Sequence, residues 1–328
     1  MSAAVLGKLL AIIVTVALGW LAGRLRWLGD TQADPARILS NAAFYIFVPA
    51  LLFRTTARVD LGTLPAGLLA AYFVPTLALL LAVYGVQQLR QRQQTGAEPA
   101  LPAVRAISVS YGNAVQMGIP MSAAMFGEAG LGLHLMLVSV HGLILLSVLT
   151  ALVELDLARS KARQTQRSGL CHTLRSTLRN TVIHPVVLPV LLGLTWNLLG
   201  LGLPALVDEV LQLLGSAVVP LCLVLIGLSL AYYGLQGSVR GALGVTLLKL
   251  LGLPALVLFV AHWGFGLAGL PLSVLVMLAA LPVGSNALIF AQRYKTIQAE
   301  ATAAIVFSTL AFVATAPLWL AVLARLGS

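Results

Sequence analysis

The chain has 328 residues, 59% of them hydrophobic and 9% charged, with a mean hydropathy of +0.98 and a formal net charge of +10. So few charged residues cannot cover the surface of a water-soluble fold of this length, which excludes a soluble globular protein. The apolar residues form continuous runs of roughly 18–25, long enough to cross about 30 Å of hydrocarbon as helices and unlike the alternating strands of a membrane β-barrel. These features predict an all-α integral membrane protein.

The runs predict ten transmembrane helices, five on each side of a polar segment. In chain order we expect them at 3–23, 37–54, 64–88, 103–126, 131–155, 181–200, 205–233, 241–264, 271–292 and 299–324. The polar segment, 156–180, divides the chain into a first repeat at 1–155 and a second at 181–328. Because each half has an odd number of spans, the second half enters the membrane in the opposite orientation, as in an inverted repeat.

Lysines and arginines are distributed unevenly over the expected connections. Fifteen lie in the connections after helices 1, 3, 5, 7 and 9, whereas the opposite side has only Lys8, Arg54, Arg58 and Arg325. Cytoplasmic loops carry the excess of basic residues. We therefore expect a cell (inner) membrane protein with both termini outside and the basic 156–180 loop in the cytoplasm. The net charge reports topology and requires no nucleic-acid partner, although the basic loop has the charge to contact membrane lipid.

Prolines occupy matching places in the two halves. The pairs, in helix order, are Pro49 with Pro220, Pro75 with Pro254 and Pro120 with Pro282. A single match would be weak evidence, because proline is common in membrane helices. Three matches in the same helix order therefore support a repeat. For the first two pairs, a simple helix kink is the alternative explanation.

The expected fourth and ninth helices carry polar and helix-breaking residues near mid-membrane. The segments 110–122 and 279–291 each combine a proline with glycine, serine and an asparagine, Asn113 or Asn286. Proline removes a backbone donor and glycine permits unwinding, so we expect both helices to be broken, which is tolerated only inside protein or beside a cavity. If second half-helices begin near these prolines, two positive dipole ends face one point and favour an anion such as a carboxylate. Asparagines that only bond neighbouring helices are the alternative.

Lys249 lies well inside the expected helix 241–264, away from both of its ends. It compensates a substrate carboxylate, releases a proton when the site fills, or extends along its flexible stem to the cytoplasmic surface. His141 is a candidate proton relay, with a packed polar residue as the alternative. No carboxylate is expected at mid-membrane, so we expect no carboxylate-based sodium or proton site, while carbonyls at the broken helices are candidate cation ligands.

Signals of enzymatic chemistry are missing from the sequence. It contains no Gly-x-Ser-x-Gly, His-Glu-x-x-His or Walker motif. Cys171 and Cys222 offer neither a disulfide framework nor a Cys-x-x-Cys metal site. We therefore expect no enzyme, no catalytic residue, no metal site and no cofactor.

Two of these segments resemble motifs of a known family. Residues 113–120, Asn-Ala-Val-Gln-Met-Gly-Ile-Pro, followed by Met-Phe-Gly at 125–127, resemble the fourth-helix motif of the auxin efflux carrier (AEC) family. Leu-Pro at 281–282 with Ile-Phe-Ala-Gln-Arg-Tyr at 289–294 resembles its ninth-helix motif. Further matches to the family pattern are Asn41 with Pro49, Gly215 with Pro220 and Gly227, and Ser308-Thr309 with Pro317. The similarity covers nearly the whole chain.

The resemblance implies ten helices in a 5+5 inverted repeat, related in fold to the bile-acid sodium symporters, with helices 4 and 9 crossing at their prolines. It implies a scaffold of helices 1, 2, 6 and 7 and a transport domain of helices 3–5 and 8–10 that moves as an elevator. Family substrates are organic anions: indole-3-acetate in plants, and malate or malonate for bacterial members, whose type the short central loop favours. A homodimer is implied by resemblance only. His184-Pro185 departs from the family's usual Asn-Pro.

The sequence therefore predicts a permease, a secondary transporter that moves a small organic anion, a mono- or dicarboxylate, by elevator-type alternating access. A channel, or a membrane solute sensor that does not transport, is the alternative. The expected substrate-binding residues are Asn113, Gln116, Pro120, Pro282, Ser285, Asn286, Asn41 and Lys249. The exact substrate, the direction of transport, the coupling ion, the oligomeric state and the roles of His141 and His184 stay open.

Overall fold

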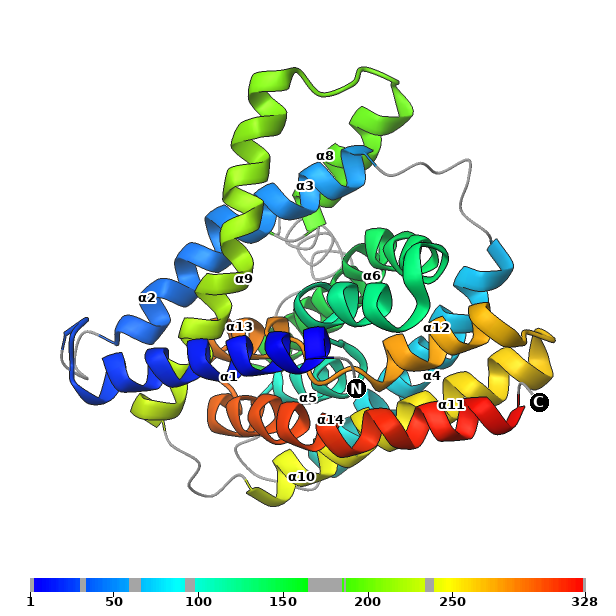
Figure 1. Ribbon diagram of the computed structural model, residues 1–328. Coiled ribbons are helices and arrows are strands. Elements are labelled where there is room, and N and C mark those ends of the chain that lie inside the picture. The colour runs from blue at the N-terminus through cyan, green and yellow to red at the C-terminus, as the bar shows by residue number, and fades with distance from the viewer. Residues whose placement is uncertain are drawn as a thin grey trace.

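The computed structural model describes residues 3–29, 34–58, 66–91, 98–164, 185, 187–233 and 239–326. All regular elements in this part of the chain are helices (Figure 1). The β-structure of the described residues is limited to an isolated antiparallel bridge between Gly112 and Val283. The predicted all-α class is confirmed.

The described helices are numbered in chain order. They are α1 (Ala3–Arg24), α2 (Pro35–Ala42), α3 (Val48–Arg58), α4 (Ala66–Gln91), α5 (Leu101–Ser110), α6 (Ile119–Gln164), α8 (Val187–Leu198), α9 (Ala205–Tyr233), α10 (Val239–Leu247), α11 (Leu253–Phe259), α12 (Gly269–Ala280), α13 (Asn286–Arg293) and α14 (Gln298–Leu326). Between some of them lie short π-helical turns, η2 (Ala43–Phe47), η3 (Ala114–Gly118), η4 (Leu248–Gly252) and η5 (Val260–Gly264).

Within the described residues, six helical segments are long and apolar enough to cross a membrane. They are Pro35–Arg58, Ala66–Gln91, Met121–Ser160, Ala205–Tyr232, Val239–Gly264 and Gln298–Leu326. Shorter apolar helices accompany them at Leu101–Ser110, Val187–Leu198 and Gly269–Ala280. Length and composition therefore support a multi-pass membrane protein with at least these six spans.

The boundaries around α6 differ in part from those expected. The expected connection between the fourth and fifth helices is confirmed as a kink at Gly127, where the backbone adopts φ +62°, a conformation that favours glycine. The expected end of the fifth helix at 155 is wrong, because α6 continues to Gln164 through residues that form helix readily although they are polar. The rest of the expected central loop, 165–180, and His184 lie outside the described residues.

Three prolines each follow a π-helical turn by two residues. Pro49 comes after η2, Pro120 after η3 and Pro254 after η4, and each is the second residue of the α-helix that continues. A proline lacks the amide proton and its ring clashes with the carbonyl four residues earlier, so a locally widened turn relieves the conflict. Pro75 and Pro220 instead lie inside α4 and α9 with no such turn.

Small residues bring α1 and α9 into close contact. A Cβ atom added at Gly19 would collide with the carbonyl oxygen of Val224, and one added at Gly227 would collide with that of Val16. In a membrane, where lipid removes much of the hydrophobic drive for helix association, such close backbone approach is a main source of packing energy. These glycines therefore hold α1 against α9.

A polar cluster joins α4, α5 and α14. The guanidinium of Arg105 donates to both carboxylate oxygens of Glu300, at 2.7 and 2.6 Å, and to the side-chain oxygen of Gln87 at 2.9 Å. The Glu300 side chain is 8% exposed and that of Arg105 is 23% exposed. A bidentate pair with so little exposure is costly to break, because the remaining charge is left without its partner.

Replacing Glu300 with alanine is expected to lower the free energy of unfolding by about 3 kcal/mol, since it leaves the Arg105 charge partly buried and uncompensated. A thermal unfolding scan of the purified protein in detergent measures the effect. Glu128→Ala, which removes an exposed carboxylate, is the control and should leave the midpoint almost unchanged. Equal midpoints for the two variants would contradict a structural role for the pair.

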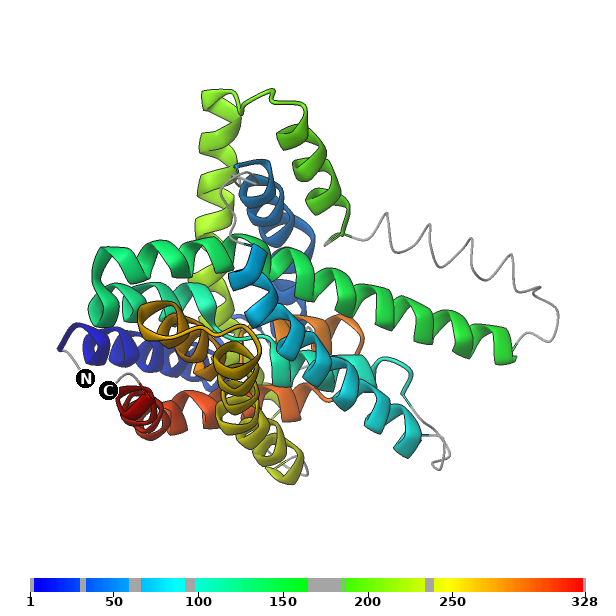
Figure 2. The ribbon, with the colours of Figure 1, turned by 90° about the vertical axis from the view of Figure 1, so that its right-hand side faces the viewer.

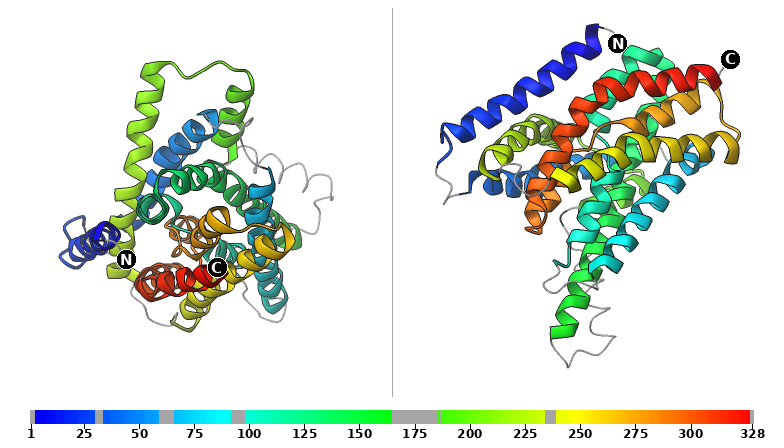
Figure 3. Two further views of the ribbon diagram at one scale, coloured as in Figure 1. Left: turned by 45° about the vertical axis from the view of Figure 1, so that its right-hand side comes forward. Right: turned by 90° about the horizontal axis from the view of Figure 1, so that it is seen from below.

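The start of α1 and the end of α14 lie at the opposite end of the molecule from the C-terminal end of α6. Figures 2 and 3 place the N- and C-terminal ends at one end of the helix bundle, and the C-terminal part of α6 projects from the other. In Figure 1, α3, α8 and the upper part of α9 stand together to one side of the remaining helices.

Candidate functional site

Two helices are interrupted at one shared point. The first break lies between α5 and η3, and the second between α12 and α13. Across them, the amide of Asn113 donates to the carbonyl of Pro282 and the amide of Gly284 donates to the carbonyl of Tyr111, both at 2.9 Å. Each extended segment thus satisfies the backbone of the other, as non-helical backbone inside a membrane requires. The predicted interruption of these two segments is confirmed.

The position of the first break differs from the expected one. We expected the second half-helix to begin near Pro120, but helical structure resumes at Ala114, six residues earlier. Pro120 instead follows the π-helical turn, while Pro282 lies inside its own break, ahead of α13. The position of each break is set by the backbone hydrogen bonds between the two segments, which require a small residue where the segments approach closely.

Gly284 is the tightest point of this crossing. A Cβ atom there would lie 2.7 Å from Cδ1 of Tyr111 and 2.9 Å from the carbonyl oxygen of Gly112. On Gly112, an added Cβ would meet Nζ of Lys249 at 3.3 Å. Glycine is thus required at Gly284 for close approach of the two chains.

A cavity of about 380 Å³ opens beside the crossing, bounded by both breaks and by α3, α6 and α9. Its polar lining residues are Arg54, Thr55, Thr56, Tyr111, Asn113, Ser139, His141, Gln212, Ser216, Ser285 and Asn286. Arginine is the one charged residue type in this lining, and no aspartate or glutamate from the described part of the chain belongs to it. The volume is within the range of small-molecule sites.

The starts of both second half-helices reach this cavity. Asn113 and Ala114 line it from the beginning of η3, and Ser285 and Asn286 line it from the beginning of α13. The N-terminal end of a helix carries partial positive charge and unsatisfied amides. The cavity wall therefore combines two positive helix ends with one cationic side chain.

A second cavity, of about 290 Å³, lies on the other side of Asn113 between α1, α9 and α14. Its other lining residues are Val16, Ala17, Trp20, Leu223, Ile226, Leu230, Ile305, Val306, Thr309 and Leu310. The lining is almost entirely apolar, so it offers little to orient a charged solute.

Comparison with known proteins identifies the family of the chain. A family model described as a membrane transport protein matches residues 4–320, a range that includes both breaks and the cavity. The chain belongs to this membrane transport protein family. It is the family of the auxin efflux carriers, whose motifs the broken segments resemble.

Curated relatives of this membrane transport protein match along nearly its whole length. The uncharacterized transporter YfdV of Escherichia coli K12 is 28% identical over 321 residues, which cover 96% of each chain. An uncharacterized transporter of Methanothermobacter thermautotrophicus is 25% identical over 315 residues, which cover 96% of this chain and 97% of the relative. The relatives thus share almost the full span of the chain.

The structure of this membrane transport protein brings together part of the predicted set of binding residues. Asn113, Ser285 and Asn286 are half-buried and line the cavity. Pro282 is buried in the crossing, where its carbonyl accepts from Asn113. By contrast, Asn41 occupies an exposed position of α2 and is not part of either cavity lining. Gln116 lies in η3 and Pro120 at the start of α6, and the structure describes only their backbone.

Lys249 lies behind the crossing and not in the cavity lining. Its side chain is 0% exposed, and Nζ donates to the carbonyl oxygen of Ala279 at 2.6 Å. Ala279 belongs to the last turn of α12, so the ammonium lies at the negative end of that half-helix. The alternative in which Lys249 extends to the membrane surface is therefore wrong, because the side chain ends inside the protein.

Several cavity residues were not predicted as binding residues. Arg54, Tyr111, His141 and Gln212 are among them. The His141 ring packs on Tyr111 with centroids 4.6 Å apart, and its buried Nε2 has no hydrogen-bond partner in the described part of the chain. The sequence analysis placed Arg54 among the few basic residues on the side opposite to most of the charge, and in the structure it pairs with Asp208.

Proposed function

We propose that this protein is a secondary transporter that carries a small organic anion, a mono- or dicarboxylate, across the cytoplasmic membrane by alternating access. The observation that carries the proposal is that the starts of two broken half-helices, at Asn113 and Ser285, line one cavity. Broken helices that meet near mid-membrane are the usual binding-site architecture of secondary transporters with internal repeats.

The preference for an anion rests on the positive charge of the cavity wall. Both helix ends present their positive poles, and no carboxylate from the described residues lines the cavity. A cationic solute would be repelled by the same wall, whereas a carboxylate finds donors from several directions. The site residues for this proposal are Asn113, Ser285 and Asn286, together with Gln116 of the half-helix that begins after Asn113.

The arrangement of the chain supports the finer topology that we propose with this function, ten spans in a 5+5 inverted repeat. Both broken elements have the same order, a helix, a short extended break and a second helix. The two chain ends lie together, as an even total number of spans requires (Figures 2 and 3). The end of α6 lies opposite them, as an odd number of spans in the first half requires. Scaffold and transport domains that move as an elevator complete the proposal.

A channel, or a sensor that binds solute without moving it, is the second candidate function. The close packing of Gly284 against Tyr111 and Gly112 argues against a continuous open pore at the crossing. Counterflow separates these functions, because only a carrier exchanges labelled for unlabelled substrate across the membrane.

The direct test is uptake into proteoliposomes of purified protein. Labelled acetate, malonate, malate and indole-3-acetate are supplied with and without a pH gradient, and with sodium or potassium. We expect saturable uptake of at least one carboxylate, with trans-stimulation by the same compound inside. Uptake of a cation or neutral solute and of no anion would refute the proposed substrate class, and conduction without counterflow would indicate a channel.

A further inference from the structure

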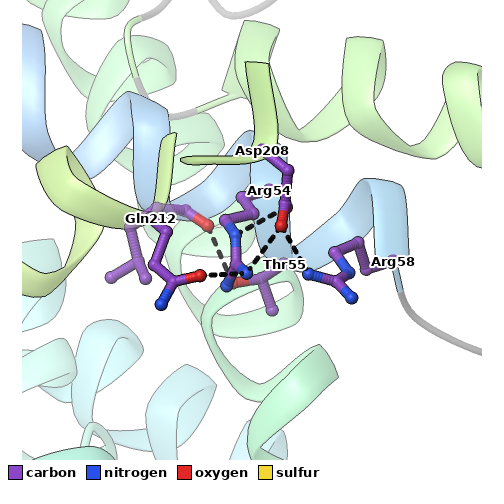
Figure 4. Close-up of polar contacts among 6 residues, drawn as sticks. Arg54, Thr55, Arg58, Asp208 and Gln212 are labelled. Carbon is purple, nitrogen blue, oxygen red and sulfur yellow. Dashed lines mark hydrogen bonds and ion pairs between the residues drawn. The ribbon is translucent and has the colours of Figure 1, made fainter. Parts of the chain in front are cut away.

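We infer that Arg54 is the residue that binds the carboxylate of the transported anion, and that Asp208 and Gln212 hold its guanidinium in place. This inference rests on the proposed function and names the charged group of the same cavity. It starts from an ion-pair cluster at the α3–α9 contact (Figure 4).

Three hydrogen bonds hold the Arg54 guanidinium, two along one edge to Asp208 and one to Gln212. Its Nε donates to Oδ1 of Asp208 at 2.8 Å, and its Nη2 donates to Oδ2 of Asp208 at 3.1 Å and to the side-chain oxygen of Gln212 at 2.9 Å. Such a fork leaves little rotational freedom to the arginine. Asp208 and Gln212 are one turn apart on α9, so a single helix face orients the group.

The remaining donors of Arg54 are available to a ligand. Its Nη1 has no partner in the described part of the chain, although a guanidinium has five N–H donors. Arg54 lines the cavity that also contains the helix starts at Asn113 and Ser285. A carboxylate in the cavity therefore meets a pre-oriented N–H donor group on one side and helix-end donors on the crossing.

The cluster carries excess positive charge. Arg58 also binds Asp208, through Nη1 to Oδ2 at 2.8 Å, so two arginines share one carboxylate. The Arg58 side chain is 55% exposed and is not part of the cavity lining, whereas that of Arg54 is 26% exposed and is. One positive charge is thus left uncompensated, and Arg54 is the residue that presents it to the cavity.

The test compares Arg54→Gln with a matched control, Arg58→Gln, in the proteoliposome uptake of malonate. Both variants remove one arginine from the same carboxylate, but only the first removes a cavity residue. We expect the half-saturating concentration to rise at least about tenfold in Arg54→Gln and to change less than about twofold in Arg58→Gln. Arg54→Lys keeps the charge without the fork and should fall between wild type and Arg54→Gln.

A charge-exchange variant distinguishes substrate binding from a tether between α3 and α9. Arg54→Asp combined with Asp208→Arg rebuilds the ion pair with reversed polarity. If Arg54 only tethers the helices, this double variant regains both the thermal stability and the uptake that Arg54→Asp alone loses. We expect regained stability with uptake still lost, because the cavity then carries a carboxylate.

The possible failures are distinguishable. Wild-type uptake of malonate that Arg54→Gln leaves unchanged, or uptake that the charge-exchange variant restores, overturns the role of Arg54 and leaves the proposed function standing. Wild-type protein that transports no carboxylate overturns the proposed function and this inference with it. Gel filtration of each variant in detergent confirms that the compared samples are folded.

Discussion

Replacing Gly284 with valine is expected to abolish transport and to lower the free energy of unfolding by about 3 kcal/mol. The added Cβ would meet Tyr111 at 2.7 Å and the Gly112 carbonyl at 2.9 Å, so the two extended segments must separate. Overpacking costs about 1–3 kcal/mol, and each buried backbone group that loses its partner costs about 1–3 kcal/mol more. Uptake assays and thermal unfolding of the same preparation measure both effects.

Gly244→Val is the matched control for this substitution. Gly244 lies in α10 at an exposed position where an added Cβ meets no atom within 4 Å. The control should keep the wild-type unfolding midpoint and uptake, since valine favours helix slightly more than glycine does. A Gly284→Val protein as stable and as active as Gly244→Val would show that the crossing does not need close backbone approach.

Replacing Lys249 with methionine is expected to reduce transport at least about tenfold while the protein still folds. The ammonium donates to the carbonyl of Ala279 in the last turn of α12, directly ahead of the second break, so without it the break is expected to shift away from the geometry that transport needs. A tenfold loss of rate corresponds to only about 1.4 kcal/mol. The substitution also removes a buried charge, whose replacement by an apolar side chain is often neutral or stabilising. Function should therefore be lost without a fall in the unfolding midpoint.

Lys295→Met provides the control, because it removes one positive charge at an exposed position. It should leave both midpoint and uptake near wild type. Uptake by Lys249→Met that equals that of Lys295→Met would remove Lys249 from the mechanism. A large loss of stability with normal uptake per folded molecule would instead make Lys249 a structural residue.

The broken helices show what local chemistry predicts well. Proline, glycine and a buried asparagine in segments 110–122 and 279–291 conflict with a continuous helix, so the interruptions were expected from residue types alone. The exact break at 111–113 was not, because it depends on which backbone groups of the partner segment lie opposite. Pro120, the most conspicuous helix-breaking residue, does not interrupt the helix, because the π-helical turn ahead of it accommodates a proline.

The residues that line the cavity divide in the same way. Asn113, Ser285 and Asn286 were singled out from the sequence because a polar side chain in an apolar run requires a reason, and they line the cavity. Arg54 was missed because it lies near a helix end, where an arginine normally reaches water and calls for no explanation. Its partner Asp208 is 154 positions away, and only the contact between α3 and α9 brings the two together.

By itself, the sequence determined a helical membrane protein with two interrupted helices, because hydrophobic length and backbone hydrogen bonding are properties of each segment alone. The tertiary structure decided where the breaks pair, that Lys249 ends at α12 and that Arg54 lines the cavity. Those features depend on contacts between residues far apart in the chain, and no local pattern encodes which distant donor meets which acceptor.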